Sequence, residues 1–278
     1  MHKPELTKDL SPSNPQAAGR KAPVSCFIIA ANEADRIGRT IAAIAPHVSE
    51  VLVVDSGSTD ATVEISRSLG ARVLTNSWVG YGPQKRFAES ACRFDWVLNL
   101  DADEVVTEAL AAEITGLFAD GPPQHPFFRF KVVTVYPGSD RPRLWADYYN
   151  VLRLYDRRAG GFRNSLVHDS VVPGATSPQQ LKGIVHHYCY RSLAHLAAKQ
   201  NRYTKLQSEE LTKPKSYLLF RLLLEFPLSF VKYYVLRRQF TGGGFGLGVA
   251  SILAYYRTVR IWRVLKGPKT KIEPVAGA

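Results

Sequence analysis

The first 120 residues alternate between short apolar runs and segments in which apolar residues recur every three or four positions. The apolar runs predict buried strands at 24–31, 51–60, 71–76 and 95–104. The helical spacing is carried by Ile37, Ile41 and Ile44, by Thr62, Ile65 and Leu69 before Gly70, by Phe87 and Ala91, and by 108–118. This order predicts an α/β fold with a mostly parallel sheet and helices on both faces.

Beyond residue 120 the pattern changes. Alternating segments at 127–136, 150–158 and 181–190 predict further strands, and 192–211 returns to helical spacing. The longest uncharged stretch, 239–256, has 18 residues and reaches the lower limit for a spanning helix, roughly 18–20 residues. Its glycines and polar start favour an interfacial or re-entrant segment over a spanning one.

The positive charge is concentrated at the C-terminal end. The chain carries a net +12, and residues 213–278 contribute 12 basic against 2 acidic residues, a net of +10. Arg257, Arg260 and Arg263 recur at three-residue spacing beside Trp262, which favours a basic amphipathic helix on an anionic leaflet. The alternative is helices packed on the preceding α/β domain or on a second subunit. Nucleic acid is disfavoured as a partner because apolar residues dominate this region.

Two further features bear on the cell compartment. Residues 1–22 are polar and lack the apolar core of a secretory signal, so a disordered arm is expected there. Cys26, Cys92 and Cys189 are odd in number and lack CxxC spacing, which predicts buried free thiols rather than disulfides or a zinc site.

Polar clusters follow three of the predicted strands. Asn32 and Glu33 follow the first strand, Asp55 and Asp60 the second, and the acidic segment 101–104 the fourth. Ligands bind at the carboxyl ends of strands in such sheets, so these clusters are expected to converge on one site.

Asp101 and Asp103, two residues apart, suit Mg²⁺ or Mn²⁺, with a substrate phosphate completing the coordination shell. Other interpretations stay open. The acidic segment also suits the N-terminal turn of a helix, which is the expectation for Glu104. Asp55 suits an Asx-turn or a helix cap, and Lys85 a solvated charge. Neither a P-loop nor a Gly-x-Gly-x-x-Gly motif follows the first strand.

Four segments carry a resemblance to a known family: FIIAANEADRIGRTI, VLVVDSGSTDATVEI, GYGPQKRFA and WVLNLDADE. Together they resemble glycosyltransferase family 2 with its Rossmann-like GT-A fold, in particular the bacterial lipopolysaccharide core β-glucosyltransferases. The resemblance extends over 23–266. It implies a catalytic domain at 23–212 and leaves 213–278 as a helical membrane-association region.

The resemblance also implies roles for the clustered residues. Asn32, Glu33 and Asp55 are expected to contact the nucleoside of a nucleotide-sugar, and Lys85 its base or diphosphate. Asp101 is expected to support the ribose or the metal, and Asp103 to bind the metal. His187, aligned with a recurring His-Tyr pair of the family, is expected either to complete the metal shell or to be an ordinary histidine at a strand end.

A catalytic base is expected after the acidic motif, because transfer with inversion needs a base that deprotonates the acceptor hydroxyl. His168 and Asp169 match the family's Val-His-Glu segment, with Asp in place of Glu and therefore one methylene shorter. Asp169 is the expected base, and His168 is expected to orient it or to contact phosphate. An ordinary surface pair is the alternative.

These expectations define an inverting, metal-dependent glycosyltransferase. Its predicted donor is a UDP-sugar, and its predicted acceptor is a lipid-linked glycan such as a lipopolysaccharide core, at the inner face of the cytoplasmic membrane. Two alternatives stay open: transfer to a polyprenyl phosphate, and nucleotide-sugar binding without turnover. The sequence leaves the oligomeric state open.

Overall fold

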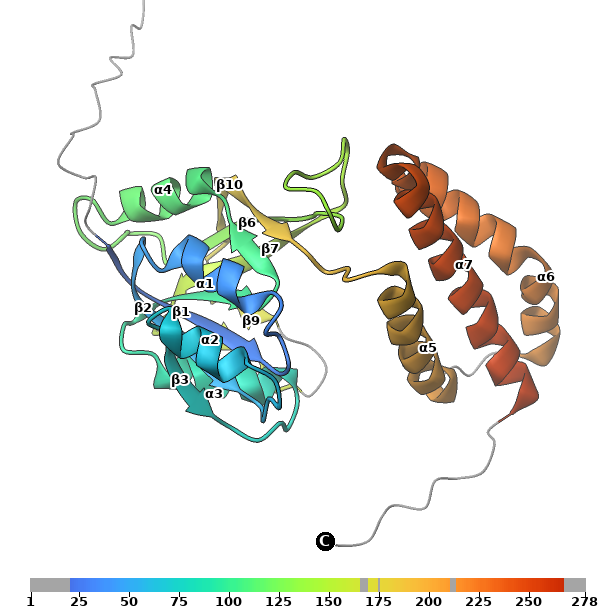
Figure 1. The fold of residues 1–278 in the computed structure, drawn as a ribbon, viewed down its shortest axis with the longest axis horizontal. Coiled ribbons are helices and arrows are strands. Elements are labelled where there is room, and N and C mark those ends of the chain that lie inside the picture. The colour runs from blue at the N-terminus through green and yellow to red at the C-terminus, as the bar shows by residue number, and fades with distance from the viewer. Residues whose placement is uncertain (1–20, 166–169, 175, 211–213, 268–278) are drawn as a thin grey trace, which may run out of the picture. The chain divides into compact units, whose positions relative to one another are not determined.

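The computed structural model describes residues 21–165, 170–174, 176–210 and 214–267 (Figure 1). In chain order its elements are β1 (Ala22–Ala30), α1 (Ile37–Ile44), β2 (Val48–Asp55), α2 (Thr62–Ser68), β3 (Arg72–Thr75), α3 (Tyr81–Ala91), β4 (Trp96–Asp101), β5 (Glu104–Val106), α4 (Glu108–Leu117), β6 (Phe127–Thr134), β7 (Tyr148–Asp156), β8 (Gly161–Phe162), β9 (Val171–Val172), β10 (Gln179–His187), α5 (Leu193–Glu210), α6 (Lys215–Val231), η2 (Lys232–Leu236), η3 (Gln239–Gly242) and α7 (Gly243–Lys266). The predicted strands and helices are therefore present, with ends that differ by a few residues. The short strands β8 and β9 were not predicted.

The central sheet is mixed. Among the described residues it has eight strands in the order β3-β2-β1-β4-β7-β6-β10-β5. The pairs β3–β2, β2–β1 and β1–β4 are parallel, whereas β4 and β7 are antiparallel. The expectation of a mostly parallel sheet holds for the first four strands in sequence, and β7 departs from it.

The helices α1 and α2 pack against each other, whereas α3 packs against β1 and β2. Connections between parallel strands are right-handed. From β1 to β3 the chain moves across the sheet in one direction, and from β3 to β4 it moves back in the opposite direction. The helix α3 therefore lies on the opposite face from α1 and α2, as the sequence predicted. Ile37, Ile41 and Ile44 are fully buried, as their spacing predicted.

The buried faces of α2 and α3 differ from the predicted ones. In α2 the buried side chains are Thr62 and Ser66, while Leu69 lies 40% exposed just after the helix. In α3 the buried face contains Gln84 and Lys85, and Phe87 is 36% exposed. In α2, Thr62 is buried as predicted, and the Ser66 hydroxyl donates to the carbonyl of Thr62 in the same helix. In α3 the apolar spacing gave the wrong face because Gln84 and Lys85 bond to residues at the ends of the strands.

The acidic segment after β4 is a turn between two strands. Strand β4 ends at Asp101, and β5 begins at Glu104, which is buried. The next helix begins only at Glu108, after Thr107, whose hydroxyl accepts a hydrogen bond from the amide of Leu110. The expectation that Glu104 belongs to the first turn of a helix is therefore wrong.

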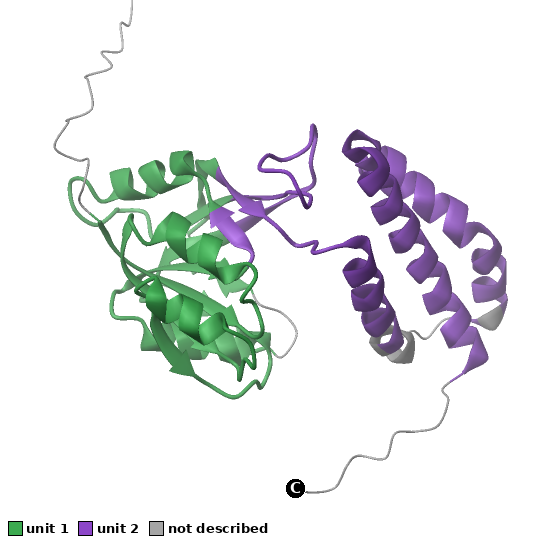
Figure 2. Cartoon of the chain, in the orientation of Figure 1, with its two compact units in different colours: residues 1–102, 106–130, 152–183 green, residues 103–105, 131–151, 184–278 purple. Residues whose placement is uncertain are grey.

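The chain forms two compact units that are interleaved in sequence (Figure 2). Unit 1 contains 1–102, 106–130 and 152–183, and unit 2 contains 103–105, 131–151 and 184–278. The boundaries of these units differ from those of the expected domains at 23–212 and 213–278, because residues 131–151 group with the C-terminal helices.

The C-terminal helices α5, α6 and α7 pack together, with α7 contacting both others. The glycines expected to mark an interfacial segment allow close packing here. A Cβ at Gly246 would lie 1.9 Å from the carbonyl oxygen of Gln239, and one at Gly248 would lie 2.5 Å from a methyl of Leu193. Within the described residues, no helix combines the length and the apolar character needed to cross a bilayer.

The arginine row of α7 also takes part in this packing. Arg257 donates to the carboxylate of Glu225 on α6 at 2.7 Å. Arg263 donates to the carbonyl of Asn201 and the hydroxyl of Thr204 on α5, at 2.9 and 2.8 Å. The expectation that the row faces a lipid leaflet does not fit these contacts.

Candidate active site

The strand register brings two of the predicted acidic residues to one edge of the sheet in unit 1. Ala30, the last residue of β1, pairs with Asp55 on β2, and Ile29 pairs with Asp101 on β4. The chain order reverses on either side of β1, which makes this edge the topological switch point where such sheets bind ligands. Asp55 and Asp101 therefore flank the end of β1, as the sequence predicted.

The loops after β1 and β2 are joined by side chains. The Asn32 amide donates to Ser58 Oγ, and Asn32 Oδ1 accepts from the amide of Thr59, both at 2.8 Å. The amide of Glu33 donates to Thr62 Oγ1 at 2.8 Å. Asn32 has φ 57°, a left-handed conformation that asparagine tolerates better than most residues. The side chain of Asn32 thus holds the second loop while its backbone turns the first.

Asp55 adopts the turn geometry that was the alternative to nucleoside binding. Its Oδ2 accepts from the amides of Gly57 and Ser58, each at 2.9 Å, and its Oδ1 accepts from the Ser58 hydroxyl. The residue is only 2% exposed. Asp55 therefore fixes the Gly/Ser turn, and its contact with a nucleoside stays a prediction.

Asp101 lies between two cationic groups. Lys85 Nζ on α3 lies 3.0 Å from Oδ1, and Arg153 Nη2 on β7 lies 3.1 Å from Oδ2. Burial opposes ionisation of Asp101, but Lys85 and Arg153 outweigh it and hold the pKa of the carboxyl well below its usual range. Asp101 is therefore a fixed carboxylate. Lys85 is fully buried, so its interpretation as a solvated charge is wrong.

Arg153, Asn99 and Gln84 are site residues that the sequence analysis missed. Arg153 also donates to Asn99 Oδ1. The two residues lie next to Leu154 and Leu98, which pair with each other across the antiparallel strands β7 and β4. Gln84 joins the ends of two strands, donating to the Ser56 hydroxyl at 3.0 Å and accepting from Asn76 Nδ2 at 2.7 Å. The sequence did indicate that Asn99 and Arg153 have partners, because each is a polar residue inside an otherwise apolar strand. It did not indicate which residues those partners are.

In unit 2 the structure brings together Asp103 and His187, two of the three residues expected at the metal. Asp103 lies in the turn between β4 and β5, and its carbonyl accepts from the amide of Tyr188 at 2.9 Å. His187 ends β10, and its Nε2 lies 3.5 Å from Asp103 Oδ1. The contact links two segments that are more than 80 positions apart in the sequence.

Two side chains are few for a metal site. Across the described part of the chain, no group of three or more His, Cys, Asp or Glu side chains could hold a metal ion. A carboxylate and an imidazole suit Mn²⁺, and Mg²⁺ is usually bound by one or two carboxylates plus phosphate and water. The residues present therefore fit a divalent cation that takes its other ligands from substrate or solvent.

The predicted base and its neighbour, Asp169 and His168, lie outside the described residues. The backbone that precedes them is held closely by α3. The amide of Gly82 donates to the carbonyl of Ser165 at 3.0 Å. A Cβ at Gly82 would lie 2.2 Å from that oxygen and 2.6 Å from the carbonyl oxygen of Arg163. Only glycine allows this approach.

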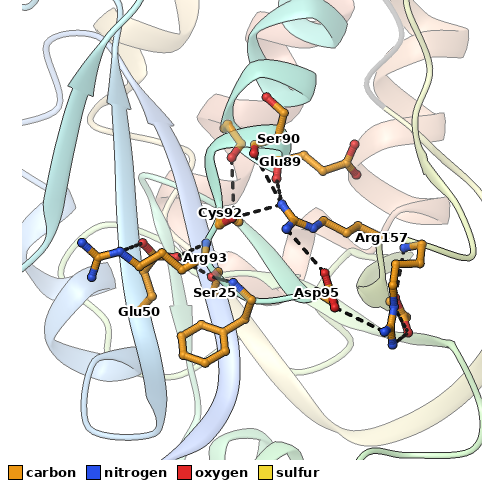
Figure 3. A network of polar contacts seen from close by, with 12 residues as sticks. Ser25, Glu50, Glu89, Ser90, Cys92, Arg93, Asp95 and Arg157 are labelled. Atoms are coloured by element: carbon orange, nitrogen blue, oxygen red, sulfur yellow. Dashed lines mark hydrogen bonds and ion pairs between the residues drawn. The ribbon is translucent and has the colours of Figure 1, made fainter.

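A second polar network in unit 1 is structural (Figure 3). Glu50 accepts from Ser25 and from the amide of Arg93, and burial, which opposes ionisation, is outweighed by these bonds and by Arg72, so its pKa is lowered. Arg157 donates to the carbonyls of Glu89 and Cys92 at the end of α3. These side chains hold helix ends and strand starts, away from the switch point.

The cysteines are free, as predicted. Cys26 and Cys92 are buried, whereas Cys189 is partly exposed. Burial raises the pKa of Cys92 and of Cys189 to about 12, so both remain protonated thiols at neutral pH.

The chain is similar in sequence to known glycosyltransferases. The sequence profile described as Glycosyl transferase family 2 matches residues 25–176. An uncharacterized glycosyltransferase of Rickettsia prowazekii is 38% identical over 248 residues, covering 86% of this chain and 85% of that one. The lipopolysaccharide core biosynthesis glycosyltransferase LpsC of Rhizobium meliloti is 29% identical, covering 77% and 81%.

A solved structure also matches part of the chain. It is glucosyl-3-phosphoglycerate synthase of Mycobacterium tuberculosis in complex with Mn²⁺, uridine diphosphate and glucosyl-3-phosphoglycerate. The identity is 28% with a TM-score of 0.33, covering 44% of this chain and 47% of that one. The profile match and the Rickettsia relative confirm the resemblance found in the sequence: the chain is a glycosyltransferase and belongs to glycosyltransferase family 2.

Proposed function

We propose that the chain is an inverting, cation-dependent glycosyltransferase that moves a sugar from a UDP-sugar to a lipid-linked glycan such as a lipopolysaccharide core. The reaction takes place at the inner face of the cytoplasmic membrane. Family membership supports the class of reaction, and the relative named for lipopolysaccharide core biosynthesis supports the class of acceptor.

The observation that carries the proposal is the arrangement of charge after β4. Asp101 is held ionised by Lys85 and Arg153, and Asp103, two residues later, lies beside His187. Asp103 and His187 would hold a divalent cation, which would supply positive charge to offset that of the leaving diphosphate. Asp101 orients the ribose or the metal-binding turn, and Lys85 acts mainly by fixing Asp101, because its buried ammonium already lies against that carboxylate.

The nucleoside binds at the switch point beside β1. Asn32 and Glu33 contact it from the loop after β1, and Asp55 shapes the facing loop. The loops are already joined to each other, and Glu33 is itself held by Arg36, whose Nε donates to Glu33 Oε2 at 2.9 Å. This bonding supports a binding site that is formed before the donor arrives.

The transfer is a single displacement. Asp169 takes the proton of the acceptor hydroxyl as its oxygen forms a bond to the anomeric carbon, and the bond from that carbon to the diphosphate breaks with inversion. His168 orients Asp169 or contacts phosphate. Both residues lie outside the described residues, so these two roles rest on the family's sequence pattern.

A donor screen tests the proposal. Purified full-length protein is incubated with Mn²⁺, a membrane-extracted acceptor and each of several nucleotide-sugars, and release of the nucleoside diphosphate is measured. One UDP-sugar is expected to give acceptor-dependent UDP release that chelation abolishes. A donor carrying another nucleotide, or turnover unaffected by chelation, contradicts the corresponding part of the proposal.

The variant Asp103→Ala is expected to abolish this release, and Asp120→Ala is its matched control. Asp120 is exposed after α4, and its replacement is expected to leave turnover at the parent level. If Asp103→Ala retains full turnover, Asp103 does not hold the cation. If no donor is turned over by the folded parent protein, binding without turnover is the better interpretation.

A further inference from the structure

The helix α6 of unit 2 is amphipathic in the reverse sense to a helix exposed to water. Its buried positions include Leu218, Glu225 and Ser229, two of them polar, and the Ser229 hydroxyl donates to Glu225 at 3.1 Å. Its outward positions are almost entirely apolar. A helix that faced water would place Glu225 and Ser229 outside and its leucines inside.

The outward side chains of α6 and the turn that follows form one apolar face, which we name the α6 face. Its members share high exposure, and they are Leu219, Phe220, Leu223, Phe226, Leu228 and Leu236. Leu223 is the most exposed of them, at 78%. A contiguous apolar face of this kind marks an interaction surface with a protein or a membrane.

The charges around the α6 face are positive. Glu225 is the single acidic residue between Pro214 and Gly267, against nine basic ones. It is already paired, with Arg221 Nε at 2.6 Å and Arg257 Nε at 2.7 Å. Burial opposes its ionisation, but the two arginines outweigh this and lower its pKa. Between Pro214 and Gly267, the single carboxylate is therefore already neutralised by two arginines.

A groove beside the α6 face combines both kinds of group. It has a volume of about 440 Å³, and its walls include Phe220, Leu224 and Leu228. Its polar wall includes Arg221, Lys232 and Arg257, together with Glu225. Three cationic groups and one carboxylate leave two net positive charges. A groove with apolar and cationic walls matches an amphiphile with an anionic head.

We propose that the α6 face docks on an anionic lipid bilayer, with the groove taking a lipid phosphate at the level of the headgroups. This deepens the membrane location proposed above by naming the surface, and it rests on no part of the transfer reaction. The positive charge of this region favours an anionic bilayer, rather than a second copy of the chain, as the occupant of the α6 face. Two copies joined through this face would bring two strongly basic helix pairs together, whereas anionic lipids attract them.

The α6 face, rather than the arginine row of α7, is the docking surface. Arg263 bonds to α5, and Arg257 bonds to Glu225 in the wall of the groove beside the α6 face. Trp262 on α7 is 47% exposed and offers a competing aromatic anchor, so its replacement separates the two surfaces.

Vesicle flotation tests the proposal without any sugar donor. Full-length protein is mixed with vesicles of phosphatidylcholine alone, or of phosphatidylcholine with phosphatidylglycerol, and the bound fraction is measured. Binding is expected to the anionic vesicles and to weaken as salt rises. Equal binding to both vesicle types, or no binding to either, overturns the proposal.

The variant Leu223→Glu places a charge at the centre of the α6 face and is expected to lower the affinity for anionic vesicles at least ten-fold. Lys232→Gln is expected to lower it about five-fold, because one basic residue near an anionic surface contributes about that factor. Leu69→Glu, a matched change on an exposed leucine of unit 1, and Trp262→Ala are expected to leave it unchanged.

Circular dichroism and thermal melting of each variant confirm that it is folded, since the replaced side chains are exposed. Unchanged vesicle affinity in folded Leu223→Glu overturns the proposal, as does a loss confined to Trp262→Ala. The mass of the parent protein in solution is measured alongside. A dimer that Leu223→Glu converts to a monomer, with vesicle affinity unchanged, shows that a second copy covers the face instead.

Discussion

Asp101 owes its fixed charge to cations from two other elements, Lys85 on α3 and Arg153 on β7. A carboxylate held this way is ionised at neutral pH and accepts hydrogen bonds there. This suits a hydrogen-bond acceptor or a ligand better than a proton-transfer group.

The stability of the fold is expected to depend on Asp101 in a defined pH range. Its folded-state pKa lies below the ordinary 3.8, so ionised Asp101 stabilises the fold above that value, and the stabilisation is lost as the pH falls toward the folded-state pKa. Asp101→Asn should therefore be less stable than the parent at pH 5. The difference should shrink by up to about 1 kcal/mol on going to pH 3.

Urea unfolding of both proteins at the two pH values measures this difference. A gap that stays constant or widens toward pH 3 contradicts the assignment of a lowered pKa to Asp101. The double variant Asp101→Asn with Lys85→Met serves as a control. It removes both partners and should be more stable than Lys85→Met alone, because the latter leaves a carboxylate without its buried ammonium.

Asp169→Asn separates the two acceptor classes. A glycan hydroxyl needs a base, so the variant is expected to lose about two to four orders of magnitude in turnover. A polyprenyl phosphate is already an anion and needs no base. Turnover close to the parent level in folded Asp169→Asn, measured as UDP release with the extracted acceptor, would therefore favour the phosphate acceptor.

At the scale of single residues, the sequence predicted positions better than partners. Asp55 and Asp101 were placed correctly because buried parallel strands bring their carboxyl ends together. Lys85 was expected in the site, but its full burial depends on Asp101 and Phe162, whose ring centre lies 5.4 Å from Nζ. Arg153 was missed because its partners come from a neighbouring strand whose register no local pattern reveals.

Among the elements, α3 has the most direct connection to the unseen part of the site. Its first turn, at Gly82, lies in backbone contact with Arg163 and Ser165, directly before the segment that contains the expected base. The close approach of the 163–165 backbone therefore depends on a residue without a side chain.

Gly82→Ala is expected to disrupt this contact. Its Cβ would lie 2.2 Å from a backbone oxygen, so either the helix start or the 163–165 backbone must move, at a cost of about 1–3 kcal/mol. Turnover should fall at least ten-fold, because Asp169 follows Ser165 by only four positions in the sequence. Thermal melting and UDP release measure the two effects.

Gly116→Ala on α4 is the matched control. Nothing lies within 4 Å of its Cβ position, and alanine is the better helix former, so stability should rise by up to about 1 kcal/mol with turnover unchanged. If Gly82→Ala is as stable and as active as Gly116→Ala, the backbone contact does not position the segment.

The periodic pattern predicted the existence of most elements, whereas their faces were predicted less well. Apolar spacing found α1 and its buried isoleucines. It gave only part of the buried face of α2, where the polar Ser66 is buried, and the wrong face for α3, whose inward Gln84 and Lys85 bond to strand ends. Composition showed that 213–278 is basic and apolar, but it did not show which way the leucines of α6 point. That direction follows from the pairing of Glu225 with Arg221 on α6 and with Arg257 on α7.

In the whole molecule, the C-terminal helices share a core with residues from the middle of the chain. Tyr136, Leu196 and Val249 form one buried cluster in unit 2, and the Tyr136 hydroxyl bonds to Gln239. Arg143 donates to the carbonyl of Arg238 at 2.8 Å. The tail is therefore part of a folded unit and not an appendage that can be removed cleanly.

Deletion of residues 214–278 is consequently expected to damage the fold as well as membrane binding. The cluster around Tyr136 loses its partners, and we expect the melting temperature to fall by about 5 °C or more, with part of the protein aggregating. Leu223→Glu should instead retain the parent melting temperature. A truncated chain that is monomeric and melts like the parent contradicts the shared core.

The bonds between the loops after β1 and β2 have a consequence for the kinetics of donor capture. Asn32 and Ser58 already hold these loops together, so a donor meets two loops that are ordered before it binds. Its association should then follow one phase, with a rate proportional to donor concentration and no slow isomerisation afterwards. Ser58→Ala removes one of the bonds between the loops and should loosen them, and a second, concentration-independent phase should appear in stopped-flow traces of that variant.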